Sequence, residues 1–184
     1  KHKDFVNLAI KECNRVKNLL ENLQSFHKPS PGKKEPVDLH KILDEILLLT
    51  QKRLSQMEVK IIKHYALGLP QVPAVTDQIK QVILNLLQNA EEAMTAKGGE
   101  IIISTKERDD QVQLRIRDTG VGIHPEQMKK LLDPFFTTKS SIKGTGLGLS
   151  ISCNIIHAHG GKITVTSGPG KGSEFTVSLP LKGT

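Results

Sequence analysis

Two short turn signals, each between alternating apolar segments, place the strongest limit on how this chain can fold. Turns this short join neighbouring antiparallel strands, whereas parallel strands need a long crossover. The sheet is therefore expected to contain hairpins, which argues against a doubly wound parallel sheet. The turns are Arg108-Asp109-Asp110, between residues 100–106 and 111–118, and Gly168-Pro169-Gly170-Lys171-Gly172, between residues 162–167 and 174–179.

Helical periodicity marks three other segments, because apolar residues recur there at three- and four-residue steps. Asp38 is placed to cap the first of these helices, and Gly98-Gly99 end the second. Hairpins and helices in this order predict an α+β sandwich with the helices on one face of the sheet. The helices are expected over about 38–56, 76–94 and 148–157, with a further strand over 59–65.

The first part of the chain has a different organisation. Residues 4–26 have the pattern of an amphipathic helix, whose apolar stripe a single helix cannot bury alone. Three prolines and a glycine within residues 27–36 end this helix and mark a linker. We therefore expect a helical segment over 1–28, a linker over 29–36 and a globular domain over 37–184.

Composition argues against several classes of protein. The chain has 184 residues, two cysteines far apart in the sequence, and no apolar run near the ~18 residues of a membrane span. We therefore expect a cytoplasmic location without membrane contact by this chain. The net charge is +7, but residues 1–34 hold eight basic and three acidic residues and so carry +5 of it. With 3% aromatic residues and no Trp, base stacking is disfavoured and no nucleic-acid partner is expected.

Two of four unusual clusters surround the second helix and the first hairpin. Asn85 and Asn89 lie four residues apart, so both amides project from one helical face. They are either hydrogen-bonded core amides or oxygen ligands of a hard cation such as Mg²⁺. Asp118-Thr119-Gly120-Val121-Gly122 follows a strand. It is either an ordinary glycine-rich turn or one whose backbone lies close to a ligand.

The other two clusters precede the last helix. Asp133-Pro134-Phe135-Phe136-Thr137-Thr138-Lys139 places two phenylalanines in a polar loop, either as an anchor on the core or as the hinge of a lid. Gly144-Thr145-Gly146-Leu147-Gly148 opens the helix, where backbone N–H groups and the helix dipole favour a phosphate. The glycine spacing is neither that of a Walker loop nor that of a Rossmann fingerprint.

Taken in order, the four clusters resemble the N, G1, F and G2 boxes of the catalytic domain of sensor histidine kinases. This domain belongs to the ATPase superfamily of gyrase B, the Hsp90 chaperones and MutL. The resemblance covers residues 37–181, and Pro-Phe-Phe-Thr-Thr-Lys and Gly-Thr-Gly-Leu-Gly-Leu look most like the nitrogen-regulation branch. It implies a two-layer α/β sandwich with a mixed sheet, the Bergerat-type ATP-binding fold. Residues 4–27 look like the second helix of the dimerisation and phosphotransfer hairpin.

The resemblance also implies ATP and Mg²⁺ as cofactors and a role for each matching residue. Asn89 would bind Mg²⁺ with Asn85 beside it, and Asp118 would bind the adenine amino group. Lys139, together with Lys143, would neutralise γ-phosphate charge from the lid, so Asn85 and Lys139 are the implied catalytic residues. The other implied nucleotide-binding residues are Gly120, Gly122, Phe135, Phe136, Gly144, Thr145, Gly146, Leu147, Gly148 and Thr176.

The chain departs from the family pattern at two places on the second helix. Glu92 and Ala93 stand where many members have Lys and an aromatic residue, which shifts the phosphate contact onto Lys139. Asn85 stands where hydrolysing relatives have a general-base Glu, which by analogy favours a kinase over a self-contained ATPase. None of the seven histidines fits the family's acceptor pattern, so the acceptor histidine is expected upstream of this chain.

The resemblance therefore implies the ATP-binding catalytic portion of a bacterial sensor histidine kinase, a transferase in two-component signal transduction. It would phosphorylate a histidine outside this chain, upstream of a response regulator. The implied partners are a response regulator receiver domain and the protein's own phosphotransfer hairpin, as a homodimer in the intact protein. The alternative is an ATP-binding switch, a protein-serine kinase or a pseudokinase of the same superfamily that acts as an interaction module.

Overall fold

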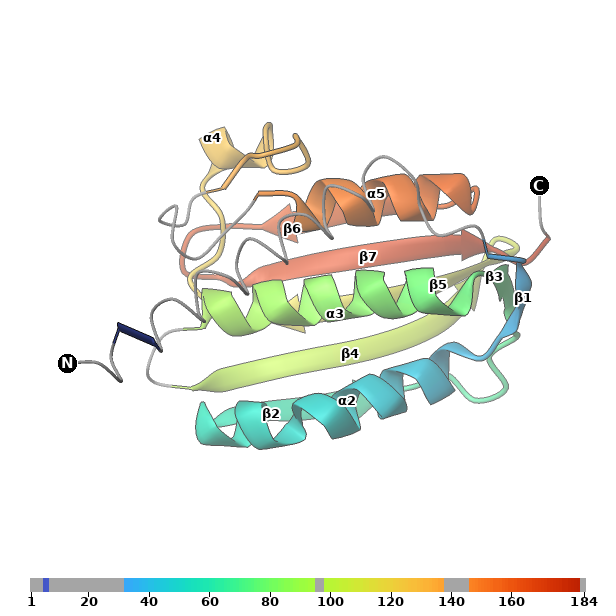
Figure 1. Ribbon diagram of the computed structural model, residues 1–184, viewed down its shortest axis with the longest axis horizontal. Helices are drawn as coiled ribbons and strands as arrows, with labels where there is room; N and C mark the ends of the chain where they lie inside the picture. The colour runs from blue at the N-terminus through green and yellow to red at the C-terminus, as the bar shows by residue number, and fades with distance from the viewer. Residues whose placement is uncertain (1–4, 7–31, 95–97, 138–145, 183–184) are drawn as a thin grey trace.

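The computed structural model describes residues 5–6, 32–94, 98–137 and 146–182, which build a two-layer fold (Figure 1). Apart from Phe5 and Val6, the helix expected over 1–28 lies outside the described residues. The elements are β1 (Glu35–Val37), α2 (Leu39–Gln56), β2 (Val59–His64), β3 (Val72–Ala74), α3 (Thr76–Ala93), β4 (Gly99–Arg108), β5 (Gln111–Asp118), α4 (Pro125–Met128), α5 (Gly148–Ala158), β6 (Lys162–Ser167) and β7 (Ser173–Pro180).

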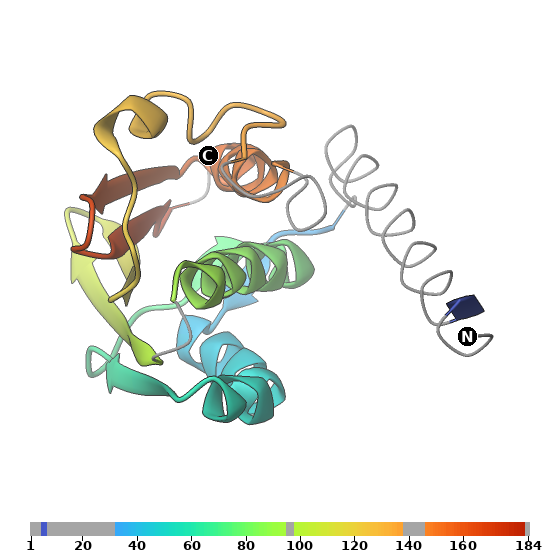
Figure 2. The same ribbon diagram turned by 90° about the vertical axis from the view of Figure 1, so that its left-hand side faces the viewer.

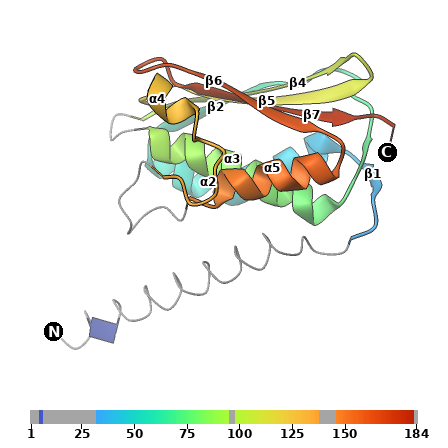
Figure 3. The same ribbon diagram turned by 90° about the horizontal axis from the view of Figure 1, so that it is seen from above.

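The main sheet has five strands in the order β2-β4-β5-β7-β6. Strand β2 runs parallel to β4, and the other neighbouring pairs are antiparallel, so the sheet is mixed. Figures 2 and 3 show α2, α3 and α5 side by side on one face of this sheet. The predicted α+β sandwich, its mixed sheet and both hairpins are confirmed. Within the described ranges, none of the helices combines the length and apolarity that crossing a bilayer requires.

Local sequence explains where the elements begin and turn. The Asp38 carboxylate accepts hydrogen bonds from the backbone N–H groups of His40 and Lys41 at 2.9 and 3.2 Å, so it caps α2 as expected. The first hairpin turns through Asp109 and Asp110, both with positive φ (54° and 57°), as a two-residue turn requires.

The small sheet formed by β1 and β3 was not expected, because proline normally argues against a strand. Pro36 and Pro73 lie opposite each other in this antiparallel pair. A two-stranded ribbon has no third strand that needs their missing N–H groups, and this explains why prolines are tolerated here. The linker expected over 29–36 therefore gives way to β1 at Glu35.

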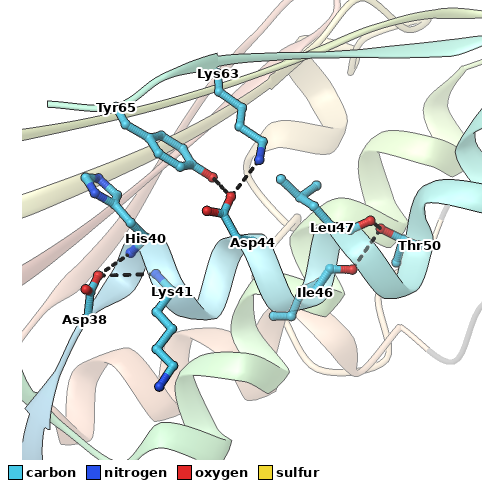
Figure 4. A network of polar contacts seen from close by, with 9 residues as sticks. All are labelled: Asp38, His40, Lys41, Asp44, Ile46, Leu47, Thr50, Lys63 and Tyr65. Carbon is cyan, nitrogen blue, oxygen red and sulfur yellow. Dashed lines mark hydrogen bonds and ion pairs between the residues drawn. The ribbon is translucent and has the colours of Figure 1, made fainter.

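A polar network holds the edge strand β2 against α2 (Figure 4). The Asp44 carboxylate accepts from the Lys63 ammonium at 2.6 Å and from the Tyr65 hydroxyl at 3.2 Å. The His40 ring stacks on Tyr65 with centroids 4.3 Å apart. The hydrogen bond from Lys63 lowers the pKa of Asp44, whereas burial and the neighbouring Asp44 raise the pKa of Tyr65. Charged groups along an edge strand also disfavour pairing with another chain.

Helix α5 is fixed against α3 by polar contacts at two places. At one end, the buried His159 accepts at Nε2 from the Val75 backbone N–H at 3.0 Å, and its Nδ1 donates to the Ile155 carbonyl at 2.7 Å. These contacts require the neutral ring with the proton on Nδ1. At the other end, Asn85 of α3 contacts Gly148 and Ser152 of α5. The two helices therefore run antiparallel with a defined register.

Candidate functional site

Three of the four sequence clusters meet at one end of the domain, on the left in Figure 1. The C-terminal half of α3 brings Asn85 and Asn89, and the end of β5 brings Asp118. The N-terminus of α5 brings Gly148. The contact between α3 and α5 described above places Gly148 beside Asn85.

Asp118 is the best-defined group of this site. Its side chain is almost fully buried, with 2% of its surface exposed. One carboxylate oxygen, Oδ1, accepts from the backbone N–H groups of Gly120 at 2.8 Å and Ser173 at 3.2 Å. Burial raises the pKa of Asp118 above its ordinary value, although these two N–H groups oppose the shift. The result is an oriented acceptor that neighbouring chain segments hold in place.

The glycines after Asp118 let three chain segments lie close together. A Cβ at Gly120 would come within 2.8 Å of the Cβ of Ala93, at the end of α3. Gly122 has φ 70°, and a Cβ there would collide with the Gly168 carbonyl oxygen. Close packing therefore excludes a side chain at both positions, and the positive φ adds a conformational requirement at Gly122.

The β6–β7 turn packs against the same segment. The Gly170 N–H donates to the Val121 carbonyl at 2.7 Å, and the Ile123 N–H donates to the Ser167 hydroxyl at 2.9 Å. The sequence pattern predicts this turn only as a hairpin connection and does not predict that it holds the Asp118 loop. Three glycines in five residues, more than a hairpin turn needs, are the sequence feature that could have indicated this role.

The asparagine pair occupies the face of α3 that borders α5. Asn85 is half-buried, and its Nδ2 donates to the Gly148 carbonyl and to the Ser152 hydroxyl, both at 3.2 Å. Asn89 is also half-buried and lies one turn further along α3. Asn85 is thus a hydrogen-bonded amide between two helices, which was one of the two interpretations left open. Its carbonyl oxygen is not used in these two bonds.

The phenylalanine cluster lies against the glycine cluster that precedes α5. A Cβ at Gly146 would come within 2.6 Å of the Phe135 carbonyl oxygen, so these two backbones are in close contact. Phe135 has φ 65° and a side chain that is 64% exposed, and Phe136 is partly buried. A positive φ is uncommon for a bulky residue and indicates local strain. Leu147 is fully buried, so its side chain anchors α5 in the core and only its backbone could contact a ligand.

Not every expected residue is at the site. Thr176 alternates with the buried Phe175 and Val177 and pairs with Arg115, so its side chain projects from the face of the sheet opposite to Asp118. The contact expected from this strand is made instead by Ser173, the first residue of β7. Lys139, Lys143, Gly144 and Thr145 lie outside the described residues.

A charged pair supports the end of α3 that carries Asn89. The Arg53 side chain of α2 makes two contacts of 2.9 Å with the carboxylate of Glu91, whose side chain is 5% exposed while that of Arg53 is 56% exposed. Loss of Arg53 would leave a buried charge without a partner, whereas loss of Glu91 would leave a charge that water can solvate.

We therefore expect unequal effects from the two sides of this pair. Arg53→Met should lower the free energy of unfolding by roughly 2–3 kcal/mol, less than for a fully buried pair because Arg53 is half-exposed. Glu91→Gln should lower the free energy of unfolding by about 1 kcal/mol, because it leaves no buried charge. Urea unfolding of both variants measures the difference. A larger loss for Glu91→Gln than for Arg53→Met would contradict this account.

The residues at the site suit a nucleotide with a bound cation. A carboxylate held by backbone donors can accept from an aromatic amine. Helix α5 begins at Gly148, and its N-cap residue Leu147 makes no side-chain capping bond, so the helix end can offer its N–H groups to a phosphate. Amide oxygens on α3 are suitable ligands for Mg²⁺. The donor set therefore fits ATP with Mg²⁺.

Comparison with known proteins supports this interpretation. The profile of the family described as histidine kinase-, DNA gyrase B-, and HSP90-like ATPase matches residues 74–183. The signal transduction histidine-protein kinase AtoS of Escherichia coli is 38% identical over 180 residues, which cover 98% of this chain and 29% of that protein. The sensory histidine kinase/phosphatase NtrB of Escherichia coli is 33% identical over 189 residues, which cover 97% of this chain and 52% of that protein. The chain thus spans less than a third of the length of the first relative and about half of the second.

Solved structures show the same fold. The catalytic domain of the histidine kinase ThkA matches with a TM-score of 0.73 and 33% identity, over 81% of this chain and 96% of that one. ThkA in complex with the response regulator protein TrrA matches with a TM-score of 0.81 and 28% identity, over 99% of this chain and 52% of that one. From its family profile, its fold and the arrangement of its site, the chain belongs to the family of histidine kinase-, DNA gyrase B- and HSP90-like ATPases.

Proposed function

We propose that this chain is the ATP-binding catalytic part of a sensor histidine kinase and that it transfers the γ-phosphoryl group of ATP to a histidine outside itself. The observation that carries the proposal is the convergence of Asp118, the Asn85–Asn89 face and the start of α5 at one end of the domain. Two relatives named histidine kinases are 38% and 33% identical to this chain over nearly its whole length.

Each part of the site has a separate task in this proposal. Asp118 accepts from the adenine amino group, and the glycines at 120 and 122 bring the backbone close enough to form the base pocket. The N–H groups at the start of α5 bind phosphate. Asn89, with Asn85 beside it, binds Mg²⁺, which supplies charge neutralisation during phosphoryl transfer. The protein contributes mainly positioning and electrostatics to such a reaction.

Asn85 supports transfer to histidine rather than to water, and Glu92 bears on which residue contacts the phosphates. Asn85 carries no carboxylate that could act as a general base for a water molecule, and its Nδ2 is already bonded to α5. Glu92 accepts from the Gln88 side chain at 2.9 Å and adds no positive charge near a phosphate. Phosphate contacts from the lid are therefore assigned to Lys139, with Lys143, in this proposal.

Two partners belong to the same proposal. A response regulator receives the phosphoryl group from the acceptor histidine, in keeping with the ThkA structure that contains such a partner. The proposal also assigns residues 4–27 to the phosphotransfer hairpin, through which the intact protein would be a homodimer, and assigns the domain to the cytoplasm. The basic character of residues 1–34 suits an acidic partner surface.

The proposal predicts phosphoryl transfer in a two-component assay. The chain is mixed with γ-labelled ATP, Mg²⁺ and a separately produced phosphotransfer hairpin that carries an acceptor histidine, and acid-labile label on histidine is measured. Asn89→Ala should reduce the affinity for ATP in the presence of Mg²⁺ by roughly tenfold or more, because a charged group loses a ligand. Asn154→Ala, at an exposed position of α5, is the matched control and should bind normally.

Two results would contradict the proposal. Equal ATP affinity in Asn89→Ala and Asn154→Ala would exclude the assigned cation site. Tight ATP binding by the original chain with label on serine, or with none on histidine across several candidate hairpins, would favour a serine kinase or an interaction module of the same superfamily.

A further inference from the structure

A closed triangle of hydrogen bonds links α3 to the first turn of α5. Asn85 Nδ2 donates to the Gly148 carbonyl and to Ser152 Oγ, both at 3.2 Å. Ser152 Oγ in turn donates to the same Gly148 carbonyl at 2.9 Å. Ser152 is fully buried and lies in no sequence cluster discussed above. Its hydroxyl is thus enclosed between the two helices.

This triangle fixes which end of the Asn85 amide faces α5. The Ser152 hydroxyl gives its proton to Gly148, so its oxygen can only accept from Asn85. The Gly148 carbonyl is also an acceptor, and both groups would repel the amide oxygen of Asn85 if the amide were turned around. Nδ2 therefore faces α5, and Oδ1 points away from these two acceptors. An amide oxygen, unlike an amide nitrogen, can bind a hard cation.

The position of α5 does not depend on this triangle alone. His159 ties the other end of α5 to Val75, at the start of α3, and the buried side chains of Leu147, Ile151 and Ile155 anchor the helix in the core. Removing one hydroxyl from Ser152 should therefore leave the helix in place. Its main consequence should be greater freedom of the Asn85 amide.

We propose that Ser152 is a positioning residue, which holds the Asn85 amide so that Oδ1 faces away from α5 and is available, beside Asn89, to Mg²⁺. The inference rests on the proposed function, because it concerns the cation bound with ATP. Ser152 itself does not contact the nucleotide or the cation. It acts through Asn85, in the way that groups behind a metal ligand orient that ligand.

Ser150 offers a closely matched control. Its hydroxyl donates to the Leu147 carbonyl at 2.9 Å, and its side chain is also buried in the first turns of α5. Ser150→Ala and Ser152→Ala each remove one buried hydroxyl that bonds back to its own helix. Only Ser152→Ala also removes a contact with Asn85.

Two measurements on the whole chain test the proposal. The first follows hydrogen exchange of the Asn85 side-chain amide by NMR without nucleotide. The second compares ATP affinity with Mg²⁺ and with a chelator. In Ser152→Ala we expect faster exchange and a two- to tenfold smaller gain in affinity on adding Mg²⁺, roughly the loss of one hydrogen bond. Ser150→Ala should change neither quantity.

The outcomes separate this inference from the proposed function. An exchange rate for Asn85 in Ser152→Ala equal to that in Ser150→Ala would overturn the inference. So would faster exchange with an unchanged response to Mg²⁺, because Ser152 would then be only a structural contact. Failure of the unsubstituted chain to bind ATP would contradict the proposed function. The exchange rates alone would still show whether Ser152 holds Asn85.

Discussion

Asp118→Asn is expected to abolish detectable ATP binding while leaving the unliganded domain at least as stable as before. Asparagine keeps an oxygen that can accept from Gly120 and Ser173, so the loop geometry should persist. Its other atom becomes an NH₂ donor, which would face the donor amine of adenine instead of accepting from it. Two donors that face each other in a buried site both lose their hydrogen bonds, which is costly. We therefore expect the affinity for ATP to fall by roughly a hundredfold or more.

The stability part of this prediction follows from the raised pKa of Asp118. Burial makes the charged carboxylate less favourable in the folded chain than in the unfolded one. The folded state therefore holds its proton more strongly. As the pH falls from neutrality through the folded pKa towards the ordinary value of 3.8, this group should make folding more favourable. Asp118→Asn removes this contribution to the pH dependence together with the buried charge.

The measurements are a titration with ATP and thermal unfolding at neutral and mildly acidic pH. Asp110→Asn is the control, because it makes the same chemical change at a turn position with positive φ that asparagine tolerates well. The control should bind ATP normally. Normal binding by Asp118→Asn would show that Asp118 does not recognise the base, and a large loss of stability would show that its charge helps to hold the loop.

Gly122→Ala is expected to disrupt the packing of the loop after β5 against the β6–β7 turn. The added Cβ would collide with the Gly168 carbonyl and lie 3.2 Å from the Gly172 carbonyl, and φ 70° is unfavourable for alanine. Backbone on both sides cannot move without breaking the Gly170–Val121 hydrogen bond. We expect a loss of about 3 kcal/mol or more in the free energy of unfolding, together with weakened ATP binding.

Gly170→Ala separates the two causes of this effect. Gly170 has the same φ of 70°, but a Cβ there has no atom within 4 Å. Gly170→Ala should therefore lower the free energy of unfolding by only about 1 kcal/mol, because it has the conformational penalty without the collision. Denaturant unfolding of both variants gives the comparison. Equal losses would mean that close packing of the loop against the turn contributes nothing to stability.

The sequence was sufficient to predict the elements whose signals are local. Asp38 lies directly before an apolar periodic segment, and the helix begins after it as expected. The hairpin at Asp109-Asp110 and the helix that starts at Gly148 were also predictable, because turn and helix-start chemistry depends on neighbouring residues. The presence of a cluster of site residues at one end of a mixed sheet followed from the family resemblance rather than from these local rules.

What could not be predicted depends on contacts between distant segments. Thr176 and Ser173 both belong to the last strand, and the register of β7 against β5 places Thr176 opposite Arg115 and Ser173 within reach of Asp118. The pairing of Pro36 with Pro73 is likewise a long-range contact that propensity disfavours. The hydrogen bond from Asn85 to Ser152 joins residues 67 positions apart, and no local pattern indicates it.

The central claim is that ATP binds where α3, the Asp118 loop and α5 meet. The most direct test is an NMR titration of the isotope-labelled chain with ATP and Mg²⁺, which follows the backbone amides of the described residues. We predict the largest shifts at Gly120, Ser173 and Gly148. The contrary result would be shifts centred on the hollow lined by Lys41, Thr76 and Lys80, because Thr76 lies ~20 Å along α3 from Asn89. Shifts there, with an unchanged Asp118 loop, would contradict the assigned site.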